Sequence, residues 1–295
     1  MKKIILVAGA TGNLGGRIVR ELLAKGADVR ALVRSGTDKN KIDVLEGLGA
    51  KVLYADLTSL PELTEACKEV TCVVSALQGL RDVIVETQSL LLEAAVATGV
   101  PRFIPSDFST DFTELAPGEN RNFDIRREFT ERLDKAGISA TSVFNGAFAE
   151  ILSYGTPLFD LKKHSVGYWE DAEHLIDFTT MDDTAAFTAA AALDDDTPRA
   201  LHIASFRISP EELSKTAGKV KNTNFQLVRM GSLEELTSFN KSERAAHPEG
   251  ENELYPRWQS SQYVQSMFSV RPYALDNERY ADVQWSSAEH FLESM

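Results

Sequence analysis

The stretch Lys3-Ile4-Ile5-Leu6-Val7-Ala8-Gly9-Ala10-Thr11-Gly12-Asn13-Leu14-Gly15, near the start of the chain, decides the fold. Its apolar run is too short for a helix and is typical of a buried strand. A glycine-rich turn follows, and residues 13–25 then have a helical pattern. A strand, a glycine turn and a helix in this order place backbone amides and the positive end of a helix where they hold a diphosphate. The stretch therefore predicts a dinucleotide-binding unit.

Each glycine of the turn has a separate purpose in such a unit. Gly9 permits the tight turn, Gly12 lets the backbone approach the pyrophosphate, and Gly15 lets the helix pack closely on the strand. We expect the whole turn to bind the cofactor, through Gly9, Thr11, Gly12, Asn13, Leu14 and Gly15.

The rest of the first half alternates short apolar runs with helical patterns. Strands are expected at residues 3–8, 28–33, 51–54, 72–75, 102–104 and 139–144. Helices are expected at residues 13–25, 39–48, 60–69, 81–98 and 122–135. Alternation of this kind is typical of an α/β Rossmann fold, a doubly wound parallel sheet with helices on both faces.

The second half has a looser pattern. An alanine-rich helix is expected at residues 179–193, a strand at 200–204, helices at 210–218, 232–241 and 255–268, and a loop at 245–255. We expect a Rossmann domain at residues 1–150 and a smaller α/β substrate lobe at 151–295, interleaved with the Rossmann sheet.

The end of the second strand distinguishes NADPH from NADH. An acidic residue usually occupies this place and binds the free ribose hydroxyl of NADH. Arg34 stands there instead, and a guanidinium is a bidentate partner for the 2′-phosphate of NADPH. Lys39 can add a contact. The ends of the third and fourth strands supply further candidates for cofactor binding, namely Asp56, Ala76, Leu77 and Gln78.

Composition excludes several other classes of protein. The chain has 295 residues and a formal net charge of −13, with most of the acidic surplus in the second half, so its surface repels nucleic acid. No apolar run has the ~20 residues of a membrane span. Cys67 and Cys72 are expected to be free thiols in a cytoplasmic protein. The five histidines show no metal-binding spacing, and the sequence identifies no oligomeric partner.

Three stretches together resemble the NmrA-like and isoflavone-reductase-like group of atypical short-chain dehydrogenases/reductases. They are residues 7–15, the stretch Pro101-Arg102-Phe103-Ile104-Pro105-Ser106-Asp107-Phe108, and the helix at 179–193 with the strand that follows it. The resemblance implies a Rossmann domain with a C-terminal substrate lobe and a cleft between them. It also implies that Asn145 and Phe148 line the nicotinamide and substrate end.

The sequence departs from that group at its chemical centre. In Phe123-Asp124-Ile125-Arg126, Arg126 stands where the group has a lysine, and Asn122 stands where the wider superfamily has a tyrosine. An arginine keeps its proton near neutral pH, so Arg126 cannot be a general acid, although it can polarise an oxygen. Our candidates for the catalytic group are Arg126, Asn122 and Ser106. The proton can come from Ser106, Asp107, Tyr154, Tyr168 or His174, which the sequence does not rank.

Aromatic residues of the substrate lobe suggest what the protein binds. We expect Phe108, Phe148, Tyr154 and Tyr168 to contact a small-molecule substrate, and Phe159 and Trp169 either to join them or to pack in the core. Two functions follow from this sequence. One is an NADPH-dependent reductase of a small apolar or aromatic carbonyl or enone. The other is a non-catalytic NADP(H)-binding redox sensor of the NmrA type, which the missing lysine favours.

Overall fold

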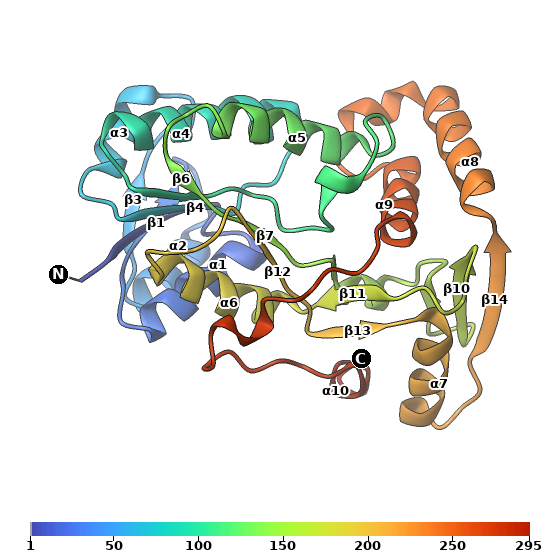
Figure 1. Ribbon diagram of the computed structural model, residues 1–295. Coiled ribbons are helices and arrows are strands. Elements are labelled where there is room, and N and C mark those ends of the chain that lie inside the picture. The colour runs from blue at the N-terminus through green and yellow to red at the C-terminus, as the bar shows by residue number, and fades with distance from the viewer. Residues whose placement is uncertain (1) are drawn as a thin grey trace. The chain divides into compact units, whose positions relative to one another are not determined.

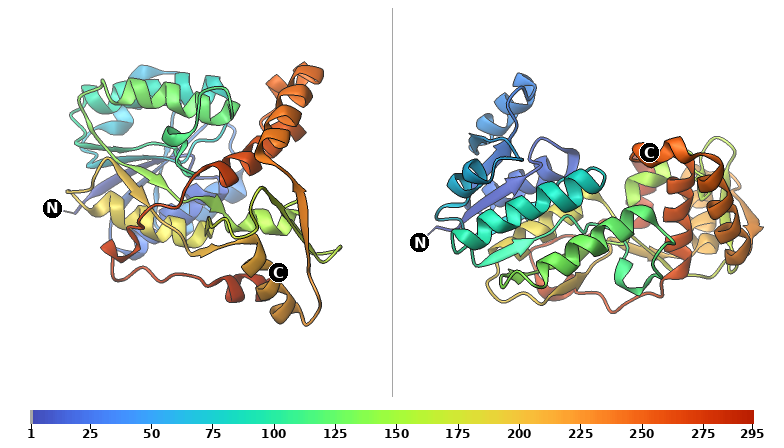
Figure 2. Two further views of the ribbon diagram at one scale, coloured as in Figure 1. Left: turned by 45° about the vertical axis from the view of Figure 1, so that its right-hand side comes forward. Right: turned by 90° about the horizontal axis from the view of Figure 1, so that it is seen from above.

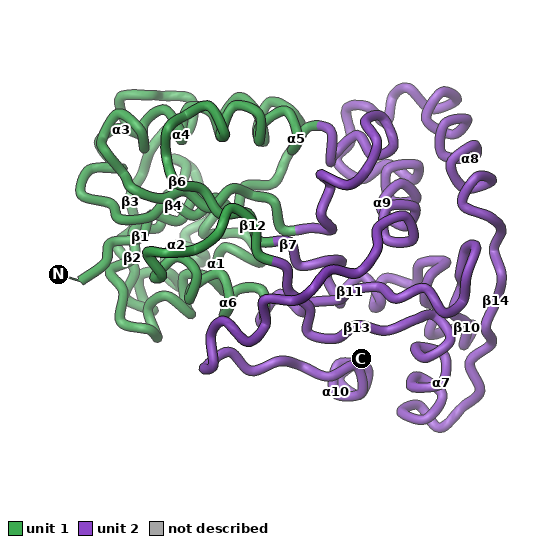
Figure 3. The backbone as a smooth tube through the Cα atoms, in the orientation of Figure 1, with its two compact units in different colours: residues 1–108, 125–143, 184–201 green, residues 109–124, 144–183, 202–295 purple. Residues whose placement is uncertain are grey.

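The chain divides into two compact units in this computed structural model, which describes residues 2–295 (Figure 3). Residue 1, at the start of the expected Rossmann domain, lies outside the described residues. Each unit is assembled from three separate stretches of the chain. The first unit comprises Met1–Phe108, Ile125–Val143 and Thr184–Leu201, and the second comprises Ser109–Asp124, Phe144–Asp183 and His202–Met295.

A six-stranded parallel sheet forms the centre of the first unit. Its strand order is β3-β2-β1-β4-β5-β6, and every pair of neighbours is parallel. The strands are β1 (Ile4–Ala8), β2 (Asp28–Val33), β3 (Lys51–Tyr54), β4 (Cys72–Ser75), β5 (Arg102–Ile104) and β6 (Ser139–Ala140). The order reverses direction beside β1, as it does in Rossmann folds, so the predicted doubly wound sheet is confirmed.

Helices cover both faces of this sheet (Figures 1 and 2). They are α1 (Asn13–Ala24), α2 (Lys39–Gly47), α3 (Leu60–Cys67), η1 (Asp82–Thr87), α4 (Gln88–Ala97), and the parts of α5 (Arg121–Leu133) and α6 (Met181–Leu193) that belong to the first unit. On the face of α3, α4 and α5, Phe103 of β5 lies in one buried cluster with Leu91 and Phe129. The ring centroids of Phe103 and Phe129 are 6.2 Å apart.

Three predicted elements differ from the structure. The helix expected at 81–98 begins as the π-helix η1 and becomes α-helical only at Gln88. The strand expected at 139–144 is broken at Thr141, because β6 pairs with β5 whereas β7 (Ser142–Phe144) pairs with β12 (Ala200–His202). Thr179 ends a strand, and the alanine-rich helix begins only at Met181.

The second unit contains two small three-stranded sheets, β14-β10-β9 and β13-β11-β8. Their strands are β8 (Ala147–Phe148), β9 (Phe159–Asp160), β10 (Ser165–Trp169), β11 (Ile176–Thr179), β13 (Phe206–Ile208) and β14 (Gln226–Gly231). Its helices are η2 (Phe112–Glu114), η3 (Ala149–Tyr154), α7 (Pro210–Lys221), α8 (Leu233–Ala246), η4 (Pro248–Asn252), α9 (Arg257–Ser269), η5 (Asn277–Arg279) and α10 (Ala288–Glu293). The short helix η4 lies where a loop was expected.

Aromatic side chains fill the core of the second unit. Phe159, Trp169, Phe178 and Phe268 are all buried in one cluster. Phe159 and Trp169 therefore have the packing role that the sequence left open for them. Among residues 2–295, no helix has both the length and the apolar character that crossing a membrane requires.

Candidate functional site

The glycine turn lies against the carboxyl end of β4 and leaves no room for a side chain at Gly9 or Gly15. Gly9 has a φ of +79°, and a Cβ atom added there would lie 2.4 Å from the carbonyl oxygen of Ala76. A Cβ atom on Gly15 would lie 2.2 Å from the carbonyl oxygen of Gly9. Gly15 thus lets α1 pack against the turn itself, and not only against the strand. Both positions require glycine for steric reasons.

The start of α1 has the properties of an anion site. Gly12 is its N-cap residue, no side chain caps the helix, and no acidic residue lies in the first turn. The amide of Gly12 already donates to the Gly9 oxygen across 2.9 Å, which closes the turn. Thr11 and Leu14 are half-buried, and Asn13 is exposed with its side-chain oxygen bonded by Arg17. A diphosphate fits here because it satisfies amides that the protein leaves uncapped.

Arg34 is the residue that the sequence predicts to contact a further phosphate. It follows the last residue of β2, is exposed, and has no ion-pair partner within residues 2–295. Thr37 donates to the Arg34 carbonyl oxygen from its backbone nitrogen and from Oγ1, at 3.2 Å and 2.7 Å, and so holds the backbone of this turn. An uncommitted guanidinium on a fixed turn suits the 2′-phosphate of NADPH.

Asp56 caps the turn after β3. Its carboxylate accepts hydrogen bonds from the backbone nitrogen of Thr58 at 2.8 Å and from Oγ1 at 2.7 Å. These bonds hold the pKa of Asp56 below its usual value. Asp56 thus has a structural role in this turn, and its contact with the cofactor stays a prediction.

Ser106 is the centre of a buried hydrogen-bond network in the first unit. Its backbone nitrogen donates to Oε1 of Gln88 at 3.0 Å, and its hydroxyl donates to the carbonyl of Leu77 at 2.6 Å. Gln88 is fully buried, and its Nε2 donates to the carbonyl of Ile84 at 3.0 Å. Gln88 therefore ties the π-helix to Ser106, and the Ser106 hydroxyl bonds the segment after β4, where Ala76 is half-buried and Gln78 is exposed.

Arg126 joins this network from α5. Its Nε donates to the carbonyl oxygen of Ser106 across 3.0 Å. Asn122 lies one turn earlier and is 2% exposed. Its amide nitrogen donates to the Leu254 carbonyl and to the Tyr263 hydroxyl, each at 3.1 Å, within the second unit. The structure thus brings Arg126 and Ser106 together and commits the side chain of Asn122 to other partners.

The predicted residues of the second unit differ widely in exposure. Phe148 and Tyr168 are half-buried on β8 and β10, whereas Tyr154 is 68% exposed at the end of η3. Asn145 is fully buried, and neither its Oδ1 nor its Nδ2 has a hydrogen-bond partner among the described residues. A buried amide without partners is costly unless a ligand or a water satisfies it. This is the observation expected of a residue that binds a polar group.

Other predicted residues have structural partners. Phe108 is 7% exposed at the end of its segment of the first unit. Asp107 accepts a hydrogen bond from Ser142 Oγ at 2.7 Å. The Nε2 atom of His174 bonds the Met267 carbonyl at 3.0 Å, and its ring stacks on Phe268. His174 is thereby held as part of the packing of the second unit.

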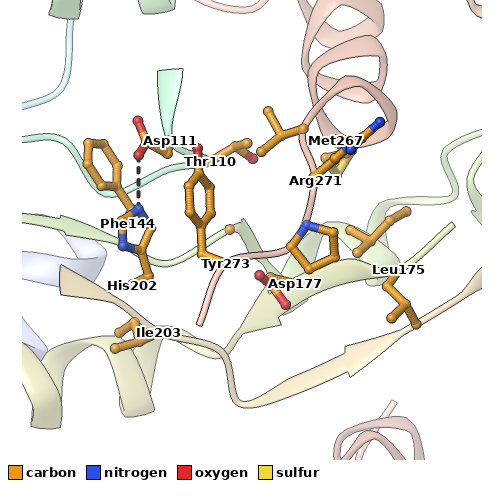
Figure 4. A pocket seen from close by; sticks show the side chains of 14 residues that line it. Thr110, Asp111, Phe144, Leu175, Asp177, His202, Ile203, Met267, Arg271 and Tyr273 are labelled. Atoms are coloured by element: carbon orange, nitrogen blue, oxygen red, sulfur yellow. Dashed lines mark hydrogen bonds and ion pairs between the residues drawn. The ribbon is translucent and has the colours of Figure 1, made fainter. Parts of the chain in front are cut away.

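Two buried polar features were not predicted from the sequence. One is Gln88. A polar residue on an otherwise apolar helix face is the sequence pattern that could have indicated it. The other is a hydrogen-bonded pair, Asp111 and His202, whose Oδ2 and Nε2 atoms are 2.9 Å apart (Figure 4). The pattern that could have indicated this pair is a histidine between Leu201 and Ile203 in an apolar strand. Nothing in the sequence connects it with an aspartate so far away in the chain.

Comparison with known proteins identifies a family and several named relatives. The model of the NmrA-like family matches residues 1–243. Pinoresinol reductase 2 of Arabidopsis thaliana is 33% identical over 216 residues, which are 68% of this chain and 67% of that protein. The bifunctional pinoresinol-lariciresinol reductase 1 of Linum usitatissimum is 29% identical over 252 residues, 79% of each chain.

Solved structures show the same fold. The structure of AtPrR2 with NADP+ and (+)pinoresinol has a TM-score of 0.79 and 25% identity, and it covers 100% of this chain and 99% of its own. A crystal structure of isoflavone reductase has a TM-score of 0.84 at 20% identity, with 100% of this chain and 99% of that chain covered, and supports the fold alone.

The fold and the glycine-loop site define an NADP(H)-binding protein of the Rossmann class. The chain belongs to the NmrA-like family.

Proposed function

We propose that the protein is an NADPH-dependent reductase of a small aromatic substrate that carries a carbonyl, an enone or a comparable reducible group. The observation that carries this proposal is Arg34, a guanidinium without a partner at the end of β2, combined with the uncapped start of α1. The relatives named as pinoresinol reductases support reduction of an aromatic substrate.

The residues expected to hold the cofactor are those of the glycine turn, Arg34 and the segment after β4. The cofactor supplies the hydride, and the protein orients the substrate and excludes water. We propose that Arg126 acts as a fixed cation that polarises the substrate oxygen, and that Ser106 positions it through the bond to its carbonyl. Asn145 offers its unpaired amide to a polar group of the bound ligands.

The test follows the absorbance of NADPH with (+)-pinoresinol, aromatic enones, aromatic ketones and quinones. Oxidation of NADPH that depends on one of these compounds supports the reductase. Tight NADPH binding without turnover of any compound supports the second candidate, a non-catalytic NADP(H) sensor. That candidate is favoured by Arg126, which cannot give up a proton near neutral pH.

A further inference from the structure

The strand β14 forms an open edge of the second unit. It is the outer strand of the sheet β14-β10-β9, in which β10 pairs with it in parallel along one side (Figure 1). Every residue from 226 to 230 is exposed. Since successive side chains of a strand point to opposite faces, both faces of β14 are open to solvent. Leu227 and Val228 are each 37% exposed and Met230 is 47% exposed, so this edge presents apolar side chains on both faces.

The hydrogen bonds of the sheet show which backbone groups of β14 point away from it. The Gln226 backbone nitrogen donates to the His164 carbonyl at 2.7 Å, so residue 226 directs its backbone groups toward β10. Because these groups alternate sides along a strand, those of Leu227 and Arg229 point away from β10. Within residues 2–295, the backbone amides and carbonyls of Leu227 and Arg229 have no hydrogen-bond partner.

The length and composition of β14 leave this edge unprotected. Native proteins protect sheet edges with very short strands, with lysine or proline, or with a covering segment. The other strands at the edges of the described sheets have two to four residues, whereas β14 has six. The strand contains neither proline nor lysine. It is therefore an edge on which a further strand can pair.

Charge favours a second copy of this chain as the partner. The chain has a formal net charge of −13, but residues 222–233 contain no acidic residue, and their one charged side chain is Arg229. Two copies therefore repel each other least where these stretches meet. Each Arg229 is in addition attracted by the acidic surplus of the other copy.

The strand is also complementary to itself. In an antiparallel pair of identical strands, a two-fold axis passes between two copies of one residue. An axis at Arg229 would set two like charges opposite each other, which is unfavourable. An axis at Leu227 would set Arg229 opposite Phe225, which is buried and whose carbonyl already accepts from the Ser214 hydroxyl at 2.9 Å. An axis at Val228 sets two valines opposite each other and Leu227 opposite Arg229, so that the outward backbone groups of both residues bond across the pair.

We propose that β14 pairs with β14 of a second copy of this chain, antiparallel and centred on Val228. The two three-stranded sheets then form one six-stranded sheet across the two-fold axis. Leu227 of each copy exchanges backbone hydrogen bonds with Arg229 of the other. One strand pair belongs to the weak, transient class of interface, below ~1,200 Å², so we expect a reversible dimer with a Kd of about 10–100 µM. This interaction is independent of the proposed reductase function.

The first test is a site-specific cross-link. Opposite residues of a non-hydrogen-bonded antiparallel pair have Cα atoms ~4.5 Å apart, within the ~4.4–6.8 Å that a disulfide spans. Val228→Cys should therefore form an intermolecular disulfide under mild oxidation. Cys67 and Cys72 are 0% and 1% exposed and do not compete.

Met230→Cys is the matched control for the cross-link. Residue 230 is more exposed than residue 228, but in the proposed register its two copies are about 14 Å apart, too far for a disulfide. We expect the disulfide dimer in Val228→Cys alone. Equal cross-linking of the two variants, or none in Val228→Cys, overturns the proposal.

The second test is sedimentation equilibrium from about 1 to 500 µM, a range that brackets the expected Kd. Val228→Asp sets two carboxylates opposite each other and should raise the Kd of the dimer at least about fivefold. Met230→Asp faces Gln226 in this register and should change the Kd by less than about threefold.

Leu227→Pro tests the backbone hydrogen bonds of the pair. It removes an outward N–H group from each copy and leaves the bonds to β10 intact, as proline does on edge strands. We expect the Kd to rise at least about 10-fold, because each copy loses one hydrogen bond across the pair and the Arg229 carbonyl opposite loses its donor. Binding of NADPH to the glycine turn should stay within about twofold and reports that the variant is folded.

The outcomes decide between the partners of β14. A wild-type protein that stays monomeric up to about 500 µM overturns the second copy as partner and leaves a strand of a different protein as the occupant. Association that neither Val228→Asp nor Leu227→Pro weakens takes place through another surface and also overturns the proposal. If Leu227→Pro does not fold, Val228→Asp and the Val228→Cys cross-link decide.

Discussion

Arg126 donates a hydrogen bond from Nε to the carbonyl oxygen of Ser106, with 3.0 Å between the two atoms. The bond fixes a permanent cation to the segment that follows β5, where ligands of doubly wound sheets bind. Arg126→Lys keeps the charge and replaces the planar guanidinium by an ammonium that can titrate. We expect the Kd of NADPH to stay within about twofold and kcat to change by about 10-fold or more, in the range of one transition-state hydrogen bond. Steady-state kinetics and calorimetry measure the two quantities. Identical kinetics in the variant would place Arg126 outside the site.

Gln88 is the residue that connects the π-helix with Ser106. Gln88→Met keeps the volume and leaves the buried Ser106 amide without its Gln88 partner. One buried unpaired group costs about 1–3 kcal/mol, so the free energy of unfolding should fall by about 1–3 kcal/mol. Urea unfolding measures this, and Gln226→Met on the exposed strand β14 serves as the control. A loss below about 0.5 kcal/mol, the usual effect of a surface change, would contradict the network.

Gly9 and Gly26 have nearly the same φ, +79° and +81°, but only Gly9 faces a neighbouring backbone. Gly26→Ala should cost about 1–2 kcal/mol from its left-handed conformation alone. Gly9→Ala adds a clash with the Ala76 carbonyl, and should therefore cost more and weaken NADPH by at least about 10-fold, or 1.4 kcal/mol. Thermal unfolding and NADPH titration of both variants measure these effects. Equal effects in the two variants would show that the close approach to Ala76 has no consequence.

Asp111 contributes a pH-dependent part of the stability. Its pKa in the folded protein is lower than the ~3.9 of an unfolded chain, so its contribution is present above pH ~4 and is lost as the pH falls through the folded pKa. The difference in unfolding free energy between wild type and Asp111→Asn should thus be larger at pH 5 than at pH 3. Urea unfolding at both pH values measures it, and a constant difference would mean that Asp111 does not titrate as described.

The sequence predicts elements well where its pattern is local. The apolar run before Gly9, the cap glycines and Arg34 at the end of β2 specify the Rossmann sheet, because each signal lies within a few residues of the structure that it forms. The strands β10, β11, β13 and β14 were not predicted, because their pairing depends on partners distant in sequence. The π-helix at 82–87 has no local signal, since Gln88 reaches both the helix and Ser106 only in the fold.

The residues of the candidate site also fall into two groups, those that local sequence predicts and those that depend on contacts between distant segments. Residues of the glycine turn follow from spacing, because one strand and one helix position them all. The pairing of Asp111 with His202 depends on two segments 91 residues apart and on the stacking of Phe144 and Tyr273. A sequence without an alignment contains no signal for such a contact. The proton donors suggested from sequence, among them His174 and Tyr154, were chosen by residue type alone.

Calorimetric titration of NADPH and NADH into wild type and Arg34→Ala tests the central claim most directly. We predict that Arg34→Ala weakens NADPH by about 10–100-fold, as expected for one charge-assisted phosphate contact of ~1.5–3 kcal/mol, and changes NADH by less than about twofold. Arg20→Ala, an exposed arginine further along α1, should leave both constants unchanged. Equal weakening of the two nucleotides by Arg34→Ala would contradict recognition of the 2′-phosphate, and absence of binding to the folded wild type would contradict the cofactor site itself.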